Sequence, residues 1–209
     1  MLEFDHVRWV GGGSGAGKTT VTRLLAERFD VGVYSTDAAI GVHSARLDGA
    51  AAPLLERFRA MTMDQRWVDG DPVDMFRTFP WFHGEGFDLM LDDLRLLRAD
   101  RPVIAEGFRL LPALVLPLLS NVRHGAWLLP TPRFRAEAFS RRVGEDAFWT
   151  RTTNPARALA NLLERDRLFT DELTHQTHHA DIDAIHVNGT QTVDRMVDDL
   201  AHRFELRGV

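Results

Sequence analysis

A glycine-rich stretch near the start of the chain has the residue types and spacing that bind phosphate groups. Residues Gly12 to Thr19 fit the pattern G-x-x-x-x-G-K-[ST], between a β-prone segment and a helical one. The glycines let backbone N–H groups converge on phosphate oxygens, and the start of the helix adds its positive dipole end. Lys18 would reach the β- and γ-phosphates of a nucleotide, and the Thr19 hydroxyl would ligate Mg²⁺. The predicted nucleotide-binding residues are Gly12, Gly13, Ser14, Gly15, Ala16, Gly17, Lys18, Thr19 and Thr20.

The use of lysine in this chain supports the same prediction. Lys18 is the only lysine among 25 lysine and arginine residues. A compact ammonium group suits a phosphate as a point charge, whereas arginine presents a planar fork. The alternative, a glycine turn with an incidental lysine, is therefore disfavoured. The sequence contains neither the N-K-x-D and D-x-x-G signatures of small GTPases nor the Walker B strand of large motor ATPases, in which four apolar residues precede Asp-Glu. It therefore favours group transfer over switching or motor activity.

Two carboxylates follow predicted strands and could take part in such a transfer. Asp37 ends the stretch "VGVYSTD", and Glu106 lies in "VIAEG". An alcohol that accepts a phosphoryl group needs orientation and a place for its proton, which a carboxylate at hydrogen-bond distance provides. Open parallel sheets bind their ligands at the carboxyl ends of the strands, where both residues are predicted to lie. The alternatives are a helix N-cap for Asp37 and an ion pair with Arg109 for Glu106.

The segments that must position these residues alternate between β-prone and helical patterns. Apolar runs predict strands at 6–10, 31–35, 103–107, 126–130 and 184–189. Helical periodicity and proline positions predict helices at 18–29, 51–68 with breaks, 87–98, 112–120, 133–142, 155–174 and 193–204. The segment 69–86 is predicted to be a long aromatic connection. This alternation is typical of an α/β protein with a parallel sheet, and a chain of 209 residues suits a single domain over 1–209.

With its Gly12–Thr19 motif, this layout resembles the P-loop kinase group, which includes nucleoside and nucleotide kinases, shikimate and gluconate kinases and chloramphenicol phosphotransferase. The element order is similar over nearly the whole chain, and the phosphate loop is the specific sequence match. The resemblance implies a three-layer P-loop NTPase fold, with a parallel sheet of about five strands, helices on both faces and a small helical lid. It also implies that Asp37 binds the attacking hydroxyl and that Glu106 holds Mg²⁺ through water or contacts the acceptor.

The resemblance places a lid at about residues 133–157, after the fourth predicted strand. Arginines supplied there stabilise charge on the transferred phosphoryl group. Arg142 and Arg141 are the predicted catalytic arginines, because they lie where a predicted helix meets the polar connection "VGED". The alternative for each is a solvated or ion-paired surface residue. Asn161 and Arg165, one turn apart on the next predicted helix, could face the same phosphates.

The acceptor pocket is expected in the segment between the second and third strands, as in similar kinases. Residues 69–87 contain an aromatic cluster with a few polar groups, a composition that suits an organic alcohol. If these rings stack on the acceptor, a nucleoside or an aromatic antibiotic is favoured over a sugar acid. The alternative is an apolar plug under a long loop. The predicted substrate-binding residues are Asp37, Glu106, Arg109, Phe82, His83 and Glu85.

Composition narrows the class of protein further. The chain has no cysteine, so disulfides and thiolate chemistry are excluded. A net charge of −5 argues against binding to a nucleic acid polymer. The longest apolar run, 110–119, is broken by prolines and is too short to span a membrane. The N-terminus lacks a basic segment followed by an apolar one, so a cytoplasmic protein without membrane contact is expected.

The sequence therefore predicts a transferase that moves the γ-phosphate of ATP to a hydroxyl of a small organic molecule. Its catalytic residues are expected to be Lys18, Asp37, Arg142 and Arg141, and its metal ligands Thr19 and Glu106. Mg²⁺ is the expected cofactor, ATP the phosphoryl donor, and a small hydroxylated compound the other partner. Two alternatives stay open: a nucleoside or nucleotide kinase, and an ATP-binding regulatory or toxin-like P-loop protein that acts on a macromolecule.

Overall fold

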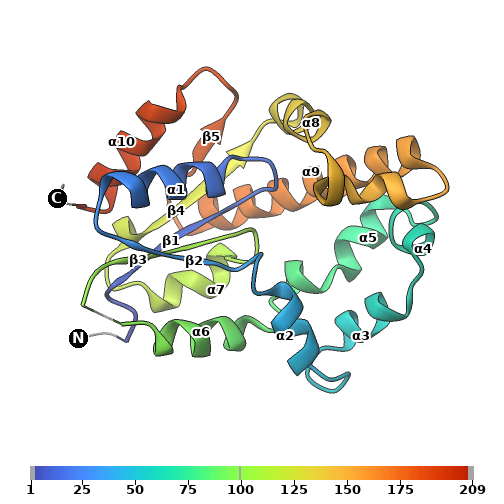
Figure 1. The fold of residues 1–209 in the computed structure, drawn as a ribbon, viewed down its shortest axis with the longest axis horizontal. Helices are drawn as coiled ribbons and strands as arrows, with labels where there is room; N and C mark the ends of the chain where they lie inside the picture. The colour runs from blue at the N-terminus through green and yellow to red at the C-terminus, as the bar shows by residue number, and fades with distance from the viewer. Residues whose placement is uncertain (1–2, 99, 207–209) are drawn as a thin grey trace.

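A five-stranded parallel sheet forms the centre of the protein in the computed structural model, which describes residues 3–98 and 100–206 (Figure 1). The strand order is β2-β3-β1-β4-β5, and every pair is parallel. This sheet confirms the predicted α/β class and the five predicted strands. The strands are β1 (Val7–Gly12), β2 (Gly32–Ser35), β3 (Val103–Glu106), β4 (Gly125–Pro130) and β5 (Ile185–Val187).

Helices cover both faces of the sheet because alternate side chains of its strands point to opposite sides. Ile104 packs with residues of α1 (Lys18–Arg28) and α10 (Val193–Arg203), whereas its neighbours Val103 and Ala105 belong to the core on the other face. That second core contains residues of α6 (Phe87–Leu96), α7 (Pro112–Val115) and α9 (Pro155–His179). Figure 1 shows α1 and α10 on one side of the sheet and α6 and α7 on the other.

A group of short helices extends the molecule beyond the ends of β1, β2 and β3 (Figure 1). The segment 51–68 forms two helices, as the predicted breaks indicated, and Thr62 starts the second with a capping box. The segment 69–86, predicted to be an irregular connection, is mostly helical instead, because Pro72 and Pro80 each begin a helix. The helices of this group are α2 (Ile40–Arg46), α3 (Pro53–Ala60), α4 (Met63–Trp67), α5 (Pro72–Thr78) and the 3₁₀-helix η1 (Pro80–His83).

The longest helix, α9, connects this group to the sheet. It packs against β4 and against α4, α5 and α7. Asn154 caps its first turn by accepting a hydrogen bond from the backbone N–H of Arg157, and Pro155 occupies the first helical position. The helix continues to His179, beyond the predicted end at 174.

The segment predicted to be a lid follows β4. It contains α8 (Pro132–Ser140) and a kinked 3₁₀ segment, η4 (Gly144–Arg151), and both pack against α9. The 3₁₀-helix η2 (Leu116–Leu118) replaces the second half of the helix predicted at 112–120, and a further 3₁₀-helix, η3 (Val122–His124), precedes β4. In the described ranges, no helix combines the length and the apolar composition needed to cross a bilayer.

Glu85 stabilises the helical group by capping α3 from a distant part of the chain. Its two carboxylate oxygens accept hydrogen bonds from the backbone N–H groups of Leu54 and Leu55, both at 2.8 Å. The residue at the N-cap position, Ala52, has no side chain that could make these bonds. Glu85 therefore acts as the N-terminal cap of α3. Its negative charge also interacts favourably with the positive end of the helix dipole.

We expect Glu85→Ala to lower the free energy of unfolding by about 1–2 kcal/mol, the usual cost of losing a charged helix cap. Urea unfolding followed by tryptophan fluorescence measures this change. The matched control is Glu56→Ala on the same helix, which removes only an exposed contact to Arg59 and should cost less than about 0.5 kcal/mol. Equal losses in both variants would contradict the capping role.

Candidate functional site

The glycine loop, residues 12–17, joins the end of β1 to the start of α1. Gly12 has a φ of 124°, and a Cβ at this position would overlap the carbonyl oxygen of Leu128 on the neighbouring strand. Gly17, with a φ of 83°, stands at the N-cap position and provides no side-chain cap. Gly17, Lys18 and the next two residues line a cavity. A helix start that faces a cavity without a side-chain cap is suited to bind an anion.

Lys18 is buried at the first position of α1, close to both predicted carboxylates. Its Nζ donates hydrogen bonds to the carbonyl oxygens of Gly12 and Gly13, at 3.2 and 2.9 Å. Burial lowers the pKa of the ammonium group, and the negative charges of Asp37 and Glu106 oppose this effect. Hydrogen bonds thus hold the ammonium group against the glycine loop, where it interacts electrostatically with the carboxylates of Asp37 and Glu106.

Glu106 links the ends of three elements through its carboxylate. Oε1 accepts a hydrogen bond from the Ser35 hydroxyl of β2 at 2.7 Å, and Oε2 accepts one from the Thr19 hydroxyl of α1 at 3.2 Å. Burial raises the pKa of Glu106 above its ordinary value, although these hydroxyl groups and Lys18 act in the opposite direction. Among the described residues, Glu106 bonds to these hydroxyls, whereas Arg109 bonds to Thr36, His43 and Gly86. The alternative of a Glu106–Arg109 ion pair is therefore wrong.

Asp37 lies two residues beyond the end of β2, with an exposed side chain that lines the cavity. It is not the cap of α2, because that helix has Ala39 at its N-cap and no side-chain cap. The Thr36 hydroxyl donates to its Oδ1 at 3.3 Å. The structure thus brings Asp37 to the same cavity as Lys18 and removes the N-cap alternative.

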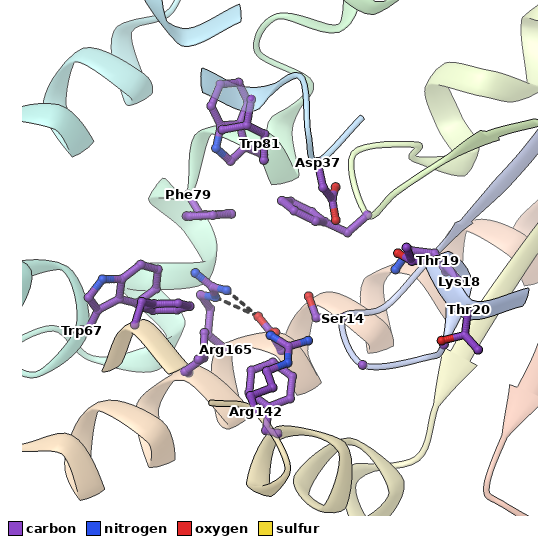
Figure 2. Close-up of a pocket in the computed structure, with 18 of the residues that line it drawn as sticks. Ser14, Lys18, Thr19, Thr20, Asp37, Trp67, Phe79, Trp81, Arg142 and Arg165 are labelled. Carbon is purple, nitrogen blue, oxygen red and sulfur yellow. Dashed lines mark hydrogen bonds and ion pairs between the residues drawn. The ribbon is translucent and has the colours of Figure 1, made fainter. Parts of the chain in front are cut away.

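One cavity of about 700 Å³ connects the glycine loop to a chamber of aromatic rings (Figure 2). At one end lie Lys18, Thr19 and Thr20, and in Figure 2 the Asp37 carboxylate lies near them and borders the same space. This volume is within the range of about 300–1,000 Å³ that is usual for small-ligand sites. The aromatic residues that line it are Phe58, Trp67, Phe79, Trp81, Phe108, Phe139 and Phe148.

The two predicted lid arginines differ in position. Arg142 lines the cavity, with its guanidinium carbon 3.8 Å from the centre of the Phe139 ring. Arg141, the preceding residue and the C-cap of α8, is exposed and is not among the described residues that line this cavity. The structure therefore brings Arg142 to the cavity but not Arg141, the other predicted catalytic arginine. Arg135, another arginine of the predicted lid that was not selected as catalytic, is buried and donates to the carbonyl oxygen of Ser14 at 3.3 Å and to the Thr170 hydroxyl.

Phe82, His83 and Glu85, which were predicted to bind the acceptor, belong to a segment that contributes to the cavity wall, but their side chains are not on its cavity-lining face. Phe82 is buried and stacks on Phe169, with ring centres 3.8 Å apart. His83 is exposed and contacts the carbonyl oxygen of Phe76 at 3.3 Å. Glu85 caps α3, as described above. None of the three is among the residues that line the cavity in the described structure, whereas their neighbours Phe79 and Trp81 are.

Arg109 is buried behind the cavity wall and acts on other residues of the site. Its guanidinium donates to the carbonyl oxygens of Thr36 and Gly86, both at 3.2 Å, and contacts Nδ1 of His43 at 3.1 Å. It also lies 4.4 Å from the ring centre of Trp81. Burial lowers the pKa of Arg109 to about 10. Arg109 is thus a positioning residue that connects the backbone beside Asp37 to the aromatic chamber.

Two further predictions concerned α9. Asn161 does not face the glycine loop: its side-chain amide donates to the carbonyl oxygens of Trp67, Val68 and Gly70, at 3.1, 3.1 and 3.3 Å. Arg165 does line the cavity, together with Asp166, which sequence reasoning did not select. The adjacent opposite charges on a helix offered the only sequence signal for this pair, and such pairs are usually exposed.

No family model matches this chain, and no curated protein matches it. The function is therefore inferred from the site itself.

The approach of Asp37 to the glycine loop depends on Gly107, which has a φ of 147°. A Cβ there would overlap the Thr36 hydroxyl oxygen and lie 2.8 Å from Oδ1 of Asp37. We expect Gly107→Ala to lower the free energy of unfolding by about 3–5 kcal/mol, because backbone strain and overpacking add. Urea unfolding measures the loss.

The control is Gly144→Ala, at a φ of 61° with no heavy atom within 4 Å of the added Cβ. It should cost only about 1 kcal/mol, the strain of the left-handed conformation. If the two substitutions cost the same, close packing at Gly107 does not determine the position of Asp37.

Proposed function

We propose that the protein is an ATP-dependent phosphotransferase of the P-loop kinase type, which moves the γ-phosphate to a hydroxyl of a small organic molecule. The observation that carries this proposal is the single cavity that joins the glycine loop, Lys18 and Asp37 to an aromatic chamber. A hydrolase or a switch needs a water beside the phosphates, but it has no use for an adjoining chamber large enough for an organic molecule.

The end of the cavity at α1 would bind the triphosphate. Backbone N–H groups of the glycine loop and the start of α1 suit the phosphate oxygens, and Lys18 supplies the positive charge. Within the described residues, no group of three or more histidine, cysteine or acidic side chains is placed to hold a metal. Mg²⁺ commonly binds through one or two protein oxygens together with phosphates and water, so Thr19 and Glu106 fit this ion. Mg²⁺ would neutralise charge on the β- and γ-phosphates.

Asp37 would orient the acceptor. The acceptor hydroxyl oxygen forms a bond to the γ-phosphorus, the bond from that phosphorus to the bridging oxygen breaks, and ADP leaves with the electron pair. The hydroxyl proton passes to the Asp37 carboxylate, which lies in the cavity wall. Arg142, also in the wall, would stabilise charge on the transferred group. The apolar rings that line the cavity would reduce the contact of the alcohol with competing water.

The burial of the aromatic residues helps to distinguish the proposed enzyme from a regulatory protein that acts on a macromolecule. An exposed apolar patch around residues 76–87 would favour a protein that acts on a macromolecular partner. Phe79, Trp81, Phe82 and Phe87 are instead buried, with at most 9% of each residue exposed. This supports a small-molecule acceptor. A nucleoside kinase differs from the proposed enzyme only in the identity of that acceptor.

A pooled library of nucleosides, sugars and hydroxylated antibiotics, incubated with Mg-ATP and the protein, tests the proposal by mass spectrometry. We expect at least one compound to gain one phosphoryl group. Lys18→Ala should reduce this gain by roughly a hundredfold or more because a preorganised positive charge is lost. Asp37→Asn should lower kcat by roughly 10²–10⁴-fold at saturating substrates, while ATP binding is retained.

Asp30→Asn is the matched control, since Asp30 is an exposed acid that pairs with Arg101 away from the cavity. Its activity should equal that of the unaltered protein. Unchanged transfer by Asp37→Asn would refute the role of Asp37. ATP binding without Lys18-dependent phosphorylation of any alcohol would refute the proposed function.

The adjacent arginines of the lid segment provide an internal comparison. Arg142→Ala should lower kcat by roughly a hundredfold, because its charge faces the cavity. Arg141→Ala removes an equal charge one residue away and should leave kcat within about twofold, as expected for an exposed side chain. Steady-state kinetics on the acceptor found in the library, with circular dichroism to check folding, measures both. Equal effects would mean that total charge matters and that the position of Arg142 does not.

A further inference from the structure

One nitrogen of Arg109 bonds to a group on each side of Asp37. Nη1 of Arg109 donates to the carbonyl oxygen of Thr36, the residue before Asp37, at 3.2 Å. The same nitrogen lies 3.1 Å from Nδ1 of His43, which belongs to α2. This helix begins at Ile40, whose backbone N–H donates to the carbonyl oxygen of Asp37 at 3.3 Å. Arg109 and His43 thus connect the segment that precedes Asp37 to the helix that follows it.

The hydrogen-bond partners of His43 determine the protonation state of its ring. A guanidinium group can only donate, so Nδ1 of His43 is the acceptor in the contact with Arg109. The other ring nitrogen, Nε2, lies 2.8 Å from Oδ2 of Asp93 on α6. Partial burial acts to raise the pKa of Asp93, but hydrogen bonds from Tyr34 and His43 hold that pKa below its ordinary value. The ionised carboxylate accepts from Nε2, so His43 is neutral and carries its proton on Nε2.

His43 is fully buried, and the groups around it leave no place for a second proton. The Tyr34 hydroxyl also donates to Oδ2 of Asp93, at 2.7 Å, and Nη1 of Arg46 lies 3.8 Å from Oδ1 of the same carboxylate. A proton on Nδ1 of His43 would point at an N–H group of Arg109 and would break the contact between them. The observed arrangement therefore requires a neutral imidazole.

The same guanidinium also reaches the aromatic chamber. Nη2 of Arg109 donates to the carbonyl oxygen of Gly86 at 3.2 Å, and its central carbon lies 4.4 Å from the ring centre of Trp81. Trp81 and Asp37 both line the cavity (Figure 2). Asp37 lies beyond the end of β2, where pairing within the sheet no longer holds the backbone. The position of Asp37 relative to the chamber thus depends on Arg109, and His43 helps to fix this guanidinium.

We propose that His43 is a positioning residue for Asp37. With its proton on Nε2, the ring is held by Asp93 and accepts from Arg109, so that one guanidinium fixes the backbone on both sides of Asp37. This set of contacts, from Arg109 to Thr36 and to His43, is the Arg109 clamp. His43 is not among the described residues that line the cavity, so it acts through the clamp and not on the reacting atoms. The inference rests on the proposed function, in which Asp37 takes the proton of the acceptor hydroxyl.

Nitrogen-15 NMR of the histidine side chains tests the protonation state in the unaltered protein. The chain has nine histidines, and the ring signals that are missing from His43→Gln identify those of His43. We expect long-range ¹H–¹⁵N correlations at neutral pH to show a protonated Nε2 and an unprotonated Nδ1. A proton on Nδ1, with or without one on Nε2, would overturn the inference. This measurement requires neither ATP nor activity.

Amide hydrogen exchange tests the clamp, also without a reaction. Exchange of the Ile40 N–H reports opening of the contact to the Asp37 carbonyl. We expect His43→Phe, which has no ring nitrogen, to speed this exchange roughly tenfold or more. His43→Gln should stay within about threefold of the unaltered protein, because its amide offers an acceptor and a donor side by side. Equal acceleration of the amides of α1 would indicate general destabilisation and would contradict the clamp.

Steady-state kinetics on the acceptor found in the library measures the effect on the reaction. We expect His43→Phe to lower kcat roughly tenfold or more, because a displaced carboxylate meets the hydroxyl less well. The KM for ATP should stay within about twofold, since the glycine loop is not part of the clamp. His43→Gln should restore most of the lost kcat. Val42→Ala, at an exposed position of the same helix, is the matched control and should leave kcat unchanged.

A double variant separates positioning of Asp37 from a general structural role. If His43 acts through Asp37, His43→Phe should change kcat by less than about twofold in a protein that already carries Asp37→Asn. A purely structural role would lower kcat by the same factor in both backgrounds, and that result would overturn the inference.

The outcomes keep this inference apart from the proposed function. If the unaltered protein phosphorylates no alcohol, while NMR and hydrogen exchange show the expected ring and clamp, the proposed function fails and the clamp stands. If an alcohol is phosphorylated and His43→Phe has the kcat of the unaltered protein, the proposed function stands and the role of His43 is refuted.

Discussion

The carboxylate of Glu106 is held at the end of β3 by hydroxyl groups from two other elements, and the candidate site depends on this arrangement. In the parallel register, Glu106 lies beside Val10 of β1 and beside Ser35 of β2. The glycine loop and Asp37 follow these two strands, so pairing through β3 sets the distance between them. A buried carboxylate is unfavourable unless hydrogen bonds compensate for its lost hydration. Thr19 and Ser35 supply them, and in doing so tie α1 and β2 to the same strand end.

Buried arginines extend this framework by binding backbone carbonyl groups. Arg109 donates to the carbonyl of Thr36, next to Asp37, and Arg135 donates to the carbonyl of Ser14 in the glycine loop. A planar guanidinium with five N–H groups can bridge backbone segments that a lysine ammonium would hold less specifically. Some of the many arginines in the chain therefore help to build the site, while others contribute charge to the surface of the protein. The single lysine stands where a compact charge fits the glycine loop.

Features that depend on local sequence could be predicted, and features that depend on side-chain direction could not. Periodicity and glycine positions located all five strands and the loop between β1 and α1, and the topology of parallel sheets placed Asp37 and Glu106 near it. The sequence pattern could not show that Phe79, and not the predicted Phe82, lines the cavity, because residues 69–86 form α5 and η1, whose turns decide which ring faces the cavity. Arg141 and Arg142 are equivalent in sequence, and only the end of α8 separates their directions. The burial of the Arg165–Asp166 pair beneath three rings is a tertiary arrangement that two adjacent opposite charges in the sequence do not indicate.

The two ends of the cavity are thus built in different ways, and this difference bears on how the proposed enzyme could vary. The end at α1 consists mainly of backbone groups whose positions require particular glycines, so a substitution there disturbs the fold itself. The aromatic end consists of side chains contributed by α3, α4, η1, α8 and η4, together with Phe79 before η1 and Phe108 after β3, all of which lie outside the strands of the sheet. Substitutions among these rings can reshape the aromatic chamber while the sheet and the glycine loop keep their contacts. In the proposed enzyme, the specificity for the acceptor could therefore change independently of the binding of the phosphoryl donor. This agrees with a glycine loop that can be recognised in the sequence and an aromatic chamber that can be described only from the structure.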